Sequence, residues 1–288
     1  MTRLSEVGEL ALLAELERRN LIVGTEDDAA QIGGLVATQD ALVEGVHFRL
    51  DWIGWRDLGY RAAAVNLSDL AASAAAPLGL LVTLAAPGDT PVDAVVELYE
   101  GIAETGVPVV GGDTTSANVL SLTVTALGHS ERVPGRAGAE AGDLLVVSGP
   151  LGASGVAFRD GRYVRPPLRL AEGARLGRTA HAMLDLSDGL AVDAGHIARR
   201  SGVRCVIELD RVPRAAGATI ADLGFGEDYE LLAAVSDPGP HTVIGRVEAG
   251  DGTVELLLHG EPYVLPGWEH FTKPLIPENL DPSGPRER

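Results

Sequence analysis

Aspartates recur in this chain where a predicted strand or helix meets a turn, or where a helical face should be buried. Carboxylate oxygens are the ligands that Mg²⁺ prefers in proteins, and bound Mg²⁺ neutralises phosphate groups. A set of scattered single aspartates therefore favours metal-assisted phosphate chemistry. The positions are Asp27, Asp28, Asp40, Asp69, Asp113, Asp185 and Asp188.

Asp69 falls on an apolar stripe of a predicted Ala-rich helix. Leu58, Ala62, Val65 and Asp69 follow helical spacing, so the carboxylate should be buried with them. A buried carboxylate needs a cation or several hydrogen-bond donors. A metal would satisfy it, and so would an internal salt bridge or a capping role, so spacing alone leaves these readings open.

Three more aspartates belong to a predicted strand and the segment before it. Thr38 and Asp40 should share one face of the strand, with Gln39 on the other. Asp40 could also be an ordinary exposed strand end. Asp27 and Asp28 could be turn formers, but adjacent carboxylates repel each other and a metal would remove that cost.

Two glycine-rich segments are candidates for phosphate contacts. Gly111 and Gly112, expected as a turn after a short strand, would let backbone N–H groups approach a phosphate while Asp113 holds a metal beside it. The segment 149–155 could likewise cradle a phosphate or form a plain tight turn. It matches neither a P-loop nor the dinucleotide-binding fingerprint.

A further acidic pair, Asp185 and Asp188, lies at a predicted strand end and helix start. Asp185 ends a strand, a place where ligands commonly bind. Ser187 and Asp188 open the following helix, so simple N-capping competes with ligand binding.

The histidines give no catalytic arrangement by spacing. Surface or capping roles are expected for His181, His196 and His241, and His47 is a candidate polar contact only. No Ser–His–Asp or Cys–His arrangement can be argued, so the sequence predicts no general base.

Composition excludes several classes of partner. The formal net charge is −18, and a chain this acidic repels nucleic acid and anionic membrane surfaces. The single cysteine, Cys205, cannot form an intramolecular disulfide, which fits a reducing compartment. The first six residues lack the apolar core of a signal peptide, and apolar runs such as 78–86 are too short to cross a bilayer. We expect a cytoplasmic protein.

Hydrophobic periodicity predicts two mixed halves of helices and strands. In the first half we expect helices at 6–19, 55–75 and 92–104 and strands at 35–43, 78–86, 107–110 and 120–128. In the second half we expect helices at 168–178 and 189–200 and strands at 144–148, 183–186, 203–209, 228–235 and 242–247. The Pro- and Gly-rich stretch 130–142 marks a boundary, giving domains 1–137 and 138–276 and a disordered tail at 277–288.

Read in order, these segments resemble the thiamine-monophosphate kinase family. The superfamily also includes aminoimidazole-ribonucleotide synthetase, selenophosphate synthetase and a hydrogenase-maturation protein. Two of the most telling motifs are Asn66-Leu67-Ser68-Asp69 and Gly226-Glu227-Asp228-Tyr229-Glu230. The matching stretches are 26–30, 40–48, 66–72, 111–115, 185–190, 226–232 and 267–271.

The resemblance implies a two-domain α+β fold with a C-terminal α/β sandwich-like domain. It also implies a homodimer whose N-terminal halves form a shared β-barrel with helices packed outside. The implied reaction uses ATP and Mg²⁺ to convert thiamine phosphate to thiamine diphosphate. The acceptor phosphate is already an anionic nucleophile, so positioning and charge neutralisation suffice without a general base.

The family pattern also assigns residues. The implied metal ligands are Asp28, Thr38, Gln39, Asp40, Asp69, Asp113, Asp185 and Asp188. The implied ATP contacts are Gly112, Asp113, Arg136 and Ser187. The implied substrate contacts are His47, Glu227 and Trp268.

The chain departs from the family pattern at three places. Glu26 replaces a glycine, Gln39 replaces a hydroxyl residue, and Ser73-Ala74 replaces Met-Gly. A metal contact at Gln39 would have to use its backbone carbonyl. The segment 155–166 is also short.

Two rival functions remain at this stage. One is an ATP-dependent synthetase of the same superfamily that acts on another small acceptor. The other is a non-catalytic Ca²⁺- or nucleotide-binding module, although the chain has no EF-hand loop. The Gly-Glu-Asp-Tyr-Glu motif and the Trp268-Glu269-His270-Phe271 ending favour the kinase.

Overall fold

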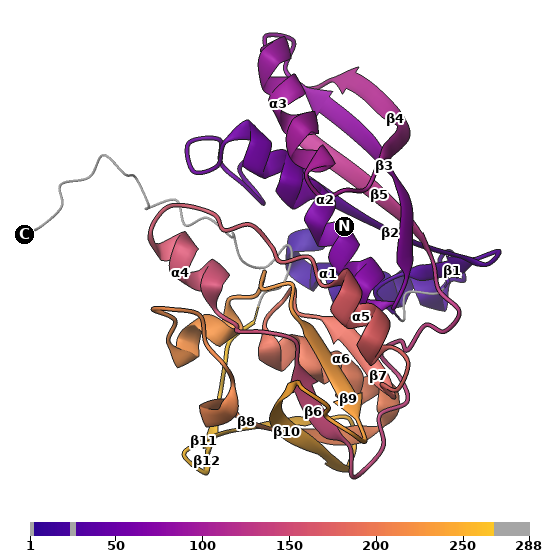
Figure 1. Ribbon diagram of the computed structural model, residues 1–288, viewed down its shortest axis with the longest axis vertical. Helices are drawn as coiled ribbons and strands as arrows, with labels where there is room; N and C mark the ends of the chain where they lie inside the picture. The colour runs from indigo at the N-terminus through magenta and orange to yellow at the C-terminus, as the bar shows by residue number, and fades with distance from the viewer. Residues whose placement is uncertain (1–2, 24–26, 268–288) are drawn as a thin grey trace, which may run out of the picture.

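The protein combines two β-sheets with helices in a mixed α+β architecture, as expected (Figure 1). The structure is a computed structural model that describes residues 3–23 and 27–267. Glu26, Trp268 and the segment 277–288 lie outside this range. The elements of the first half are α1 (Leu4–Arg18), β1 (Ala30–Ile32), β2 (Leu35–Val43), α2 (Trp55–Ala72), β3 (Ala76–Ala86), α3 (Val92–Ala103), β4 (Val109–Ser116) and β5 (Ser121–His129).

The first half forms a five-stranded sheet in the order β1-β2-β5-β3-β4. All neighbours are antiparallel except β3 and β4, whose parallel pairing is reached through the crossover helix α3. Alternation points Val36, Val82 and Val124 into a core beneath α2, whereas the other face carries half-buried and exposed side chains such as Thr125 and Leu81. Among the described residues, helices cover this sheet on one face only (Figure 1).

The second half forms a seven-stranded sheet in the order β12-β11-β8-β10-β6-β9-β7. Both of its faces are covered, which explains why β9 is buried at every position. The elements are β6 (Leu144–Val147), α4 (Ala153–Arg159), α5 (Leu170–Leu176), β7 (Ala182–Asp185), α6 (Leu190–Ser201), β8 (Val203–Glu208), the 3₁₀ turns η1 (Leu209–Arg211) and η2 (Ile220–Gly224), β9 (Leu231–Val235), β10 (Thr242–Ala249), β11 (Val254–Leu258) and β12 (Glu261–Tyr263).

Helix α2 lies between the two sheets. Its residues Leu67 and Leu70 pack into the core of the first sheet, and Ala71 and Ala72 pack against the second sheet beside Met183. Alanine is a strong helix former, and its small side chain lets backbones approach from both sides. Any polar side chain on α2 is therefore placed between both halves of the molecule.

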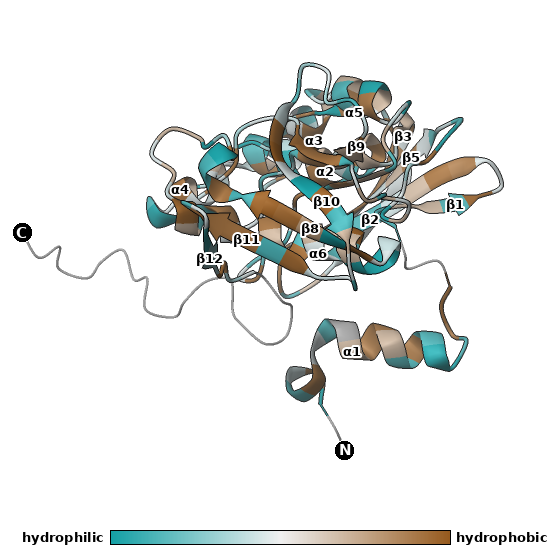
Figure 2. Cartoon of the chain, turned by 90° about the horizontal axis from the view of Figure 1, so that it is seen from below, coloured by the Kyte–Doolittle hydropathy of each residue, from teal (hydrophilic) through white to brown (hydrophobic). Residues whose placement is uncertain are grey.

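Helix α1 stands clear of both sheets (Figure 2). It was predicted as an amphipathic helix at 6–19, and the helix is present with a kink at Gly8, whose φ is +76°. Several of its side chains are exposed, including Leu4 and Val7. Among the described helices, α1 included, none combines the length and apolarity that a bilayer crossing requires.

Several sequence predictions of local structure were wrong in detail. The expected turn at Gly111-Gly112 is the middle of β4, because pairing with β3 supplies hydrogen-bond partners that no local pattern reveals. Helix α2 ends at Ala72, before the proline, with Ala74 in the left-handed region at φ +51°. The short strands β1, β11 and β12 were missed. In the described chain the first sheet is open, so it forms no closed barrel by itself.

Helices α2 and α3 approach each other through glycines. A Cβ at Gly101 would collide with the backbone of Arg56, and one at Gly59 with the backbone of Leu98. Only glycine allows this backbone contact, which holds α2 against α3 while α2 carries the site.

We expect Gly101→Ala to lower the free energy of unfolding by about 1–3 kcal/mol, because the new methyl group forces the two helix backbones apart. Urea denaturation would measure this. Gly88→Ala is the matched control, since a Cβ there meets open space, and it should change stability by less than about 1 kcal/mol. Equal stability of the two variants would contradict the close contact.

Candidate active site

A cavity of about 640 Å³ lies where α2 and β2 of the first half face the second sheet. Acidic side chains dominate its lining, and Arg136 is the only arginine or lysine among the described residues that line it. The lining residues named by the sequence are Asp27, Asp28, Thr38, Gln39, Asp40, His47, Asp69, Arg136, Asp185, Ser187, Asp188 and Glu227.

Three carboxylates form the centre of this cavity. Oxygen atoms of Asp28, Asp69 and Asp185 lie within 4.8 Å of one another. Burial, with Asp185 and Asp40 nearby, raises the pKa of Asp69 well above its usual value. Burial and the charge of Asp28 raise the pKa of Asp185 to about 8. Three acids this close cannot all ionise cheaply without a cation.

The motif on α2 supplies the hydrogen bonds that hold the acids together. Asp69 accepts a 2.5 Å bond from the Thr38 hydroxyl, which links α2 to β2. Ser68 donates to a carboxylate oxygen of Asp185 at 2.5 Å and links α2 to β7. The side-chain oxygen of Asn66 accepts the backbone N–H of Asp40 at 2.9 Å. One turn of helix therefore positions carboxylates from both sheets.

Sequence reasoning missed Asn66 and Ser68 as site residues. They are 0% and 1% exposed. Two polar residues beside Asp69 in the Ala-rich second half of the helix were the available signal, because buried polar groups need partners.

Arg136 neutralises one edge of the cluster. Its Nε and Nη2 lie 2.9 and 2.6 Å from one oxygen of Asp28. Its backbone N–H donates to Asp27 at 2.8 Å, so both members of the acidic pair are held by one residue. Burial raises the pKa of Asp28, and Arg136 opposes that rise. Asp27 and Asp28 are therefore more than turn formers, because both accept hydrogen bonds from Arg136.

The loop after β7 brings Ser187 and Asp188 to the same cavity. The capping role that competed for them falls to Asp193, whose Oδ2 accepts the backbone N–H groups of Asp188 and Gly189 at 3.1 and 3.0 Å. His196 lies near Asp188 and Asp193, a grouping that the histidine spacing did not reveal. Asp193 fixes the backbone of the loop and leaves the Asp188 side chain at the cavity.

His47, Glu227 and Tyr229 also line this cavity. The His47 Nδ1 accepts the backbone N–H of Val43 at 3.1 Å, which fixes the ring to the end of β2. Glu227 adopts φ +56°, an uncommon conformation for a residue with a side chain, and its N–H donates to Ser187 at 2.8 Å. The two substrate candidates thus lie beside the acidic cluster.

Gly112 and Asp113 are not brought to this cavity. Asp40 is in register with Val124, Val82 and Gly112 across the sheet, three strands apart, which is about 14 Å at the usual strand spacing. Asp113 is in the neighbouring row and so projects from the opposite face. Asp113 and Asp69 of one chain therefore cannot share a metal ion.

Gln39 also points away from the cluster. Strand alternation puts its side chain on the face opposite Thr38 and Asp40, where its Oε1 accepts a 2.8 Å bond from Thr125. Only its backbone is left to face the acids, as the sequence predicted.

The glycine-rich segment 149–155 is not a free phosphate cradle. Asp228, which is buried, already accepts the backbone N–H of Gly152 at 2.8 Å, and Ala153 donates to it as well. These two N–H groups are therefore not free for a phosphate, and the segment is a tight turn that leads into α4, the alternative that the sequence offered.

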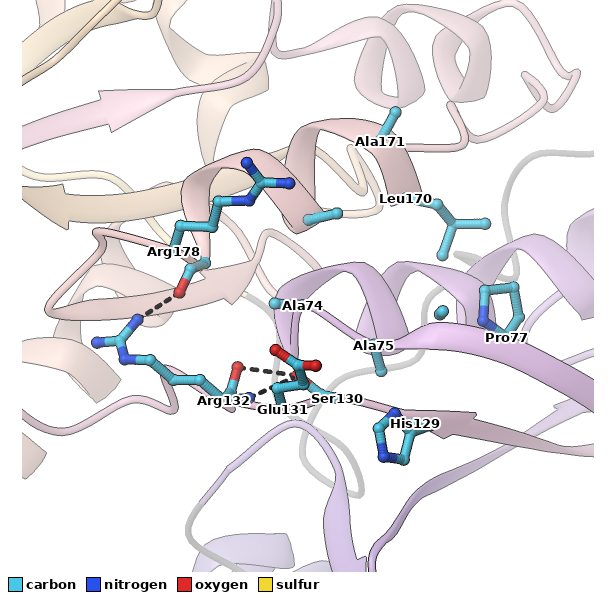
Figure 3. Close-up of a pocket in the computed structure, with 13 residues that line it drawn as sticks. Ala74, Ala75, Pro77, His129, Ser130, Glu131, Arg132, Leu170, Ala171 and Arg178 are labelled. Atoms are coloured by element: carbon cyan, nitrogen blue, oxygen red, sulfur yellow. Dashed lines mark hydrogen bonds between the residues drawn. The ribbon is translucent and has the colours of Figure 1, made fainter.

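A second cavity, of about 520 Å³, lies between the end of α2, the end of β5 and α5 (Figure 3). None of the described residues that line it is an aspartate. Arg132 reaches across and donates to the carbonyls of Gly177 and Ala180, the latter at 2.7 Å. These hydrogen bonds connect the two halves of the molecule. The cavity beside them shares no described lining residue with the cavity of the acidic cluster.

Comparison with known proteins agrees with this geometry. Residues 26–130 match the family model of the AIR synthase related protein, N-terminal domain. The thiamine-monophosphate kinase of Mycobacterium tuberculosis is 34% identical, over 94% of this chain and 94% of the relative. The chain belongs to the thiamine-monophosphate kinase family.

Solved structures of family members share the fold. The crystal structure of thiamine monophosphate kinase from Aquifex aeolicus superimposes with a TM-score of 0.80 at 32% identity, over 92% of this chain and 100% of that chain. A structure of AaThiL complexed with AMPPCP and TMP gives a TM-score of 0.84 at 32% identity, over 94% and 99%.

The acids in this member of the thiamine-monophosphate kinase family fit a divalent cation of the Mg²⁺ type. The donor set is made of oxygen atoms only, and it is buried with a raised carboxyl pKa at Asp69 and Asp185. Mg²⁺ favours oxygen ligands, and a buried acidic set without a cation is electrostatically costly.

We expect Asp69→Asn to melt at a higher temperature than the wild type in EDTA at pH 8, because one acid leaves a repelling cluster while the amide oxygen still accepts from Thr38. The wild type should gain about 2.7 kcal/mol at Mg²⁺ near 100 times its Kd, and the variant should gain little. Thermal melts with and without Mg²⁺ measure both effects.

Asp89→Asn, an exposed loop position, is the control and should behave as the wild type. A variant that is destabilised in EDTA and still stabilised by Mg²⁺ would show that Asp69 is not a cation ligand.

Proposed function

We propose that this chain transfers the γ-phosphoryl group of ATP to the phosphate of thiamine phosphate, giving ADP and thiamine diphosphate. The observation that carries the proposal is the convergence of Asp28, Asp69 and Asp185 at one cavity in a chain of this family. An oxygen of the acceptor phosphate forms the new bond to Pγ, and the bond from Pγ to the bridging oxygen of ADP breaks.

Asp28, Thr38, Asp40, Asp69, Asp185 and Asp188 would hold Mg²⁺, and the Gln39 backbone carbonyl would add to them. When bound, Mg²⁺ neutralises phosphate charge and aligns the two substrates for in-line transfer.

The chain's own residues would orient the substrates and screen the charge of their phosphates. Arg136 would contact an ATP phosphate, and Ser187, which lines the same cavity, would add a hydroxyl. Because the nucleophile is an ionised phosphate oxygen, no side chain has to remove a proton during the transfer. This agrees with a cavity rich in carboxylates that are held by hydrogen bonds to Thr38 and Ser68.

His47 and Glu227, which line the same cavity, would contact the organic part of the acceptor. Trp268, from the same family pattern, follows directly on the last described residue and would add an aromatic face to the cationic thiazolium ring.

We also propose a homodimer in which the two N-terminal sheets form a shared barrel. The exposed face and edge of the first sheet carry apolar side chains, with Leu78 54% and Val110 61% exposed. Gly112 and Asp113 on the edge strand would then serve the partner's ATP and metal site, which accounts for their distance from Asp69 of the same chain.

The division into domains 1–137 and 138–276 remains a proposal, supported by the gap between the end of β5 at His129 and the start of β6 at Leu144. A cytoplasmic location is proposed from the free, buried Cys205 and the strongly acidic composition.

We expect ADP to form at least about a hundredfold faster with thiamine phosphate than with unphosphorylated thiamine, since thiamine lacks the positioned phosphate nucleophile. A coupled assay for ADP, with ³¹P NMR of the product, measures it. Thiamine should give no more ADP than a reaction without acceptor.

Equal rates with both acceptors would refute the proposal. ADP accompanied by free phosphate, with another acceptor modified, would instead indicate a synthetase of the same superfamily.

A dimer with sites built from two chains predicts complementation. Asp40→Asn and Asp113→Asn should each be inactive alone, but co-expressed they should recover about a quarter of wild-type activity, because half the dimers are mixed and each mixed dimer keeps one intact site. ADP release by the total co-expressed protein measures this quarter, and mixed dimers isolated with tandem tags should recover about half.

Asp40→Asn mixed with Asp69→Asn is the control. Both acids line the cavity of the same chain, so no mixed dimer has an intact site and no activity should return. Recovery in the control, or none in the test pair, would contradict the shared site.

A further inference from the structure

Arg61 on α2 is a buried cation outside the acidic cluster. Its side chain is 2% exposed, and its Nε has no hydrogen-bond partner among the described residues. It lies on the same side of α2 as Val65 and Asp69, which line the cavity, four and eight residues further along. A guanidinium in such a place is costly to bury, so a purely structural role would be served as well by an apolar residue.

The guanidinium of Arg61 forms an ion pair with a residue of the second half, Glu227. Its Nη2 is ion-paired with the Oε1 of Glu227, whose side chain is 14% exposed and lines the cavity. The guanidinium carbon also lies 4.8 Å from the centre of the Tyr163 ring. The planar guanidinium is therefore held by a stacking contact and an ion pair at once.

Glu227 is fixed at its backbone as well. Its N–H donates to the carbonyl of Ser187 at 2.8 Å, and its own carbonyl accepts the hydroxyl of Ser154 at 2.5 Å. The left-handed conformation at this residue is kept by those bonds. With the backbone pinned, the contact with Arg61 is the interaction that sets where the carboxylate points.

We propose that Arg61 is a positioning residue that aims the Glu227 carboxylate at the organic part of the phosphate acceptor, and so sets affinity for thiamine phosphate but not for ATP. The inference rests on the proposed function. A pre-aimed carboxylate costs less conformational entropy on binding than one that must be ordered by the substrate.

A double-mutant cycle on binding tests it. Titrate thiamine phosphate, without ATP, into the wild type, Arg61→Met, Glu227→Gln and the double variant, and follow heat by calorimetry. Each single variant should weaken binding about tenfold, the usual order for a lost hydrogen bond to a charged group. The double variant should bind like Glu227→Gln alone, because Arg61 acts only through Glu227.

Three further measurements separate positioning from damage to the fold. Arg61→Lys keeps the charge but loses the planar stack on Tyr163, so it should fold and bind with intermediate affinity. In turnover, the Arg61 variants should raise KM for thiamine phosphate with KM for ATP and kcat within about twofold of the wild type. Arg56→Met is the control on the same helix, since Arg56 is half-exposed and pairs with Glu100 and Glu104, and it should change nothing.

The outcomes are distinct. Unchanged binding in both Arg61 variants, or effects of Arg61→Met and Glu227→Gln that add in the double variant, would overturn the positioning role. Equal losses for ATP and thiamine phosphate would show general loosening and overturn it as well. A wild type that binds no thiamine phosphate would refute the proposed function first, and this inference with it.

Discussion

The repulsion among buried carboxylates is the constraint on which this structure depends. Asp28, Asp69 and Asp185 lie within one metal-sized volume, and burial raises the pKa of each. Hydrogen bonds from Thr38 and Ser68 and the charge of Arg136 hold the acids together without removing the repulsion. A fold keeps such a cluster at a cost in stability, and functional sites are where that cost is expected.

Helix α2 makes the arrangement possible because it touches both sheets. Its alanines let it pack against two cores at once. Its glycine-mediated contact with α3 fixes its position relative to that helix. Asn66, Ser68 and Asp69 then bind β2 and β7, while Arg61, two turns earlier, ties the same helix to Glu227. Helix α2 therefore positions both the acidic cluster and Glu227.

Much of the site was predictable because its signals are local. Helical spacing placed Asp69 on a buried face, and alternation put Thr38 and Asp40 together and Gln39 opposite. The predictions that were wrong concerned residues whose partners are distant in the sequence. Gly112 and Asp113, for example, belong to a strand because β3 pairs with them. In the turn at 149–155, Asp228, far along the chain, accepts the N–H groups of Gly152 and Ala153, which no local pattern revealed. The roles of Asn66 and Ser68 were missed because their partners, Asp40 and Asp185, lie on other elements.

Proton release on cation binding tests the central claim most directly. Titrating Mg²⁺ into the metal-free chain at pH 7, in two buffers of different ionisation enthalpy, counts the protons displaced. Because the pKa of Asp185 is raised to about 8 and that of Asp69 is also raised, the account predicts protons released at pH 7 and fewer as the pH rises through 8. Binding that releases no protons, or no binding at all, would contradict a cation site built from these acids.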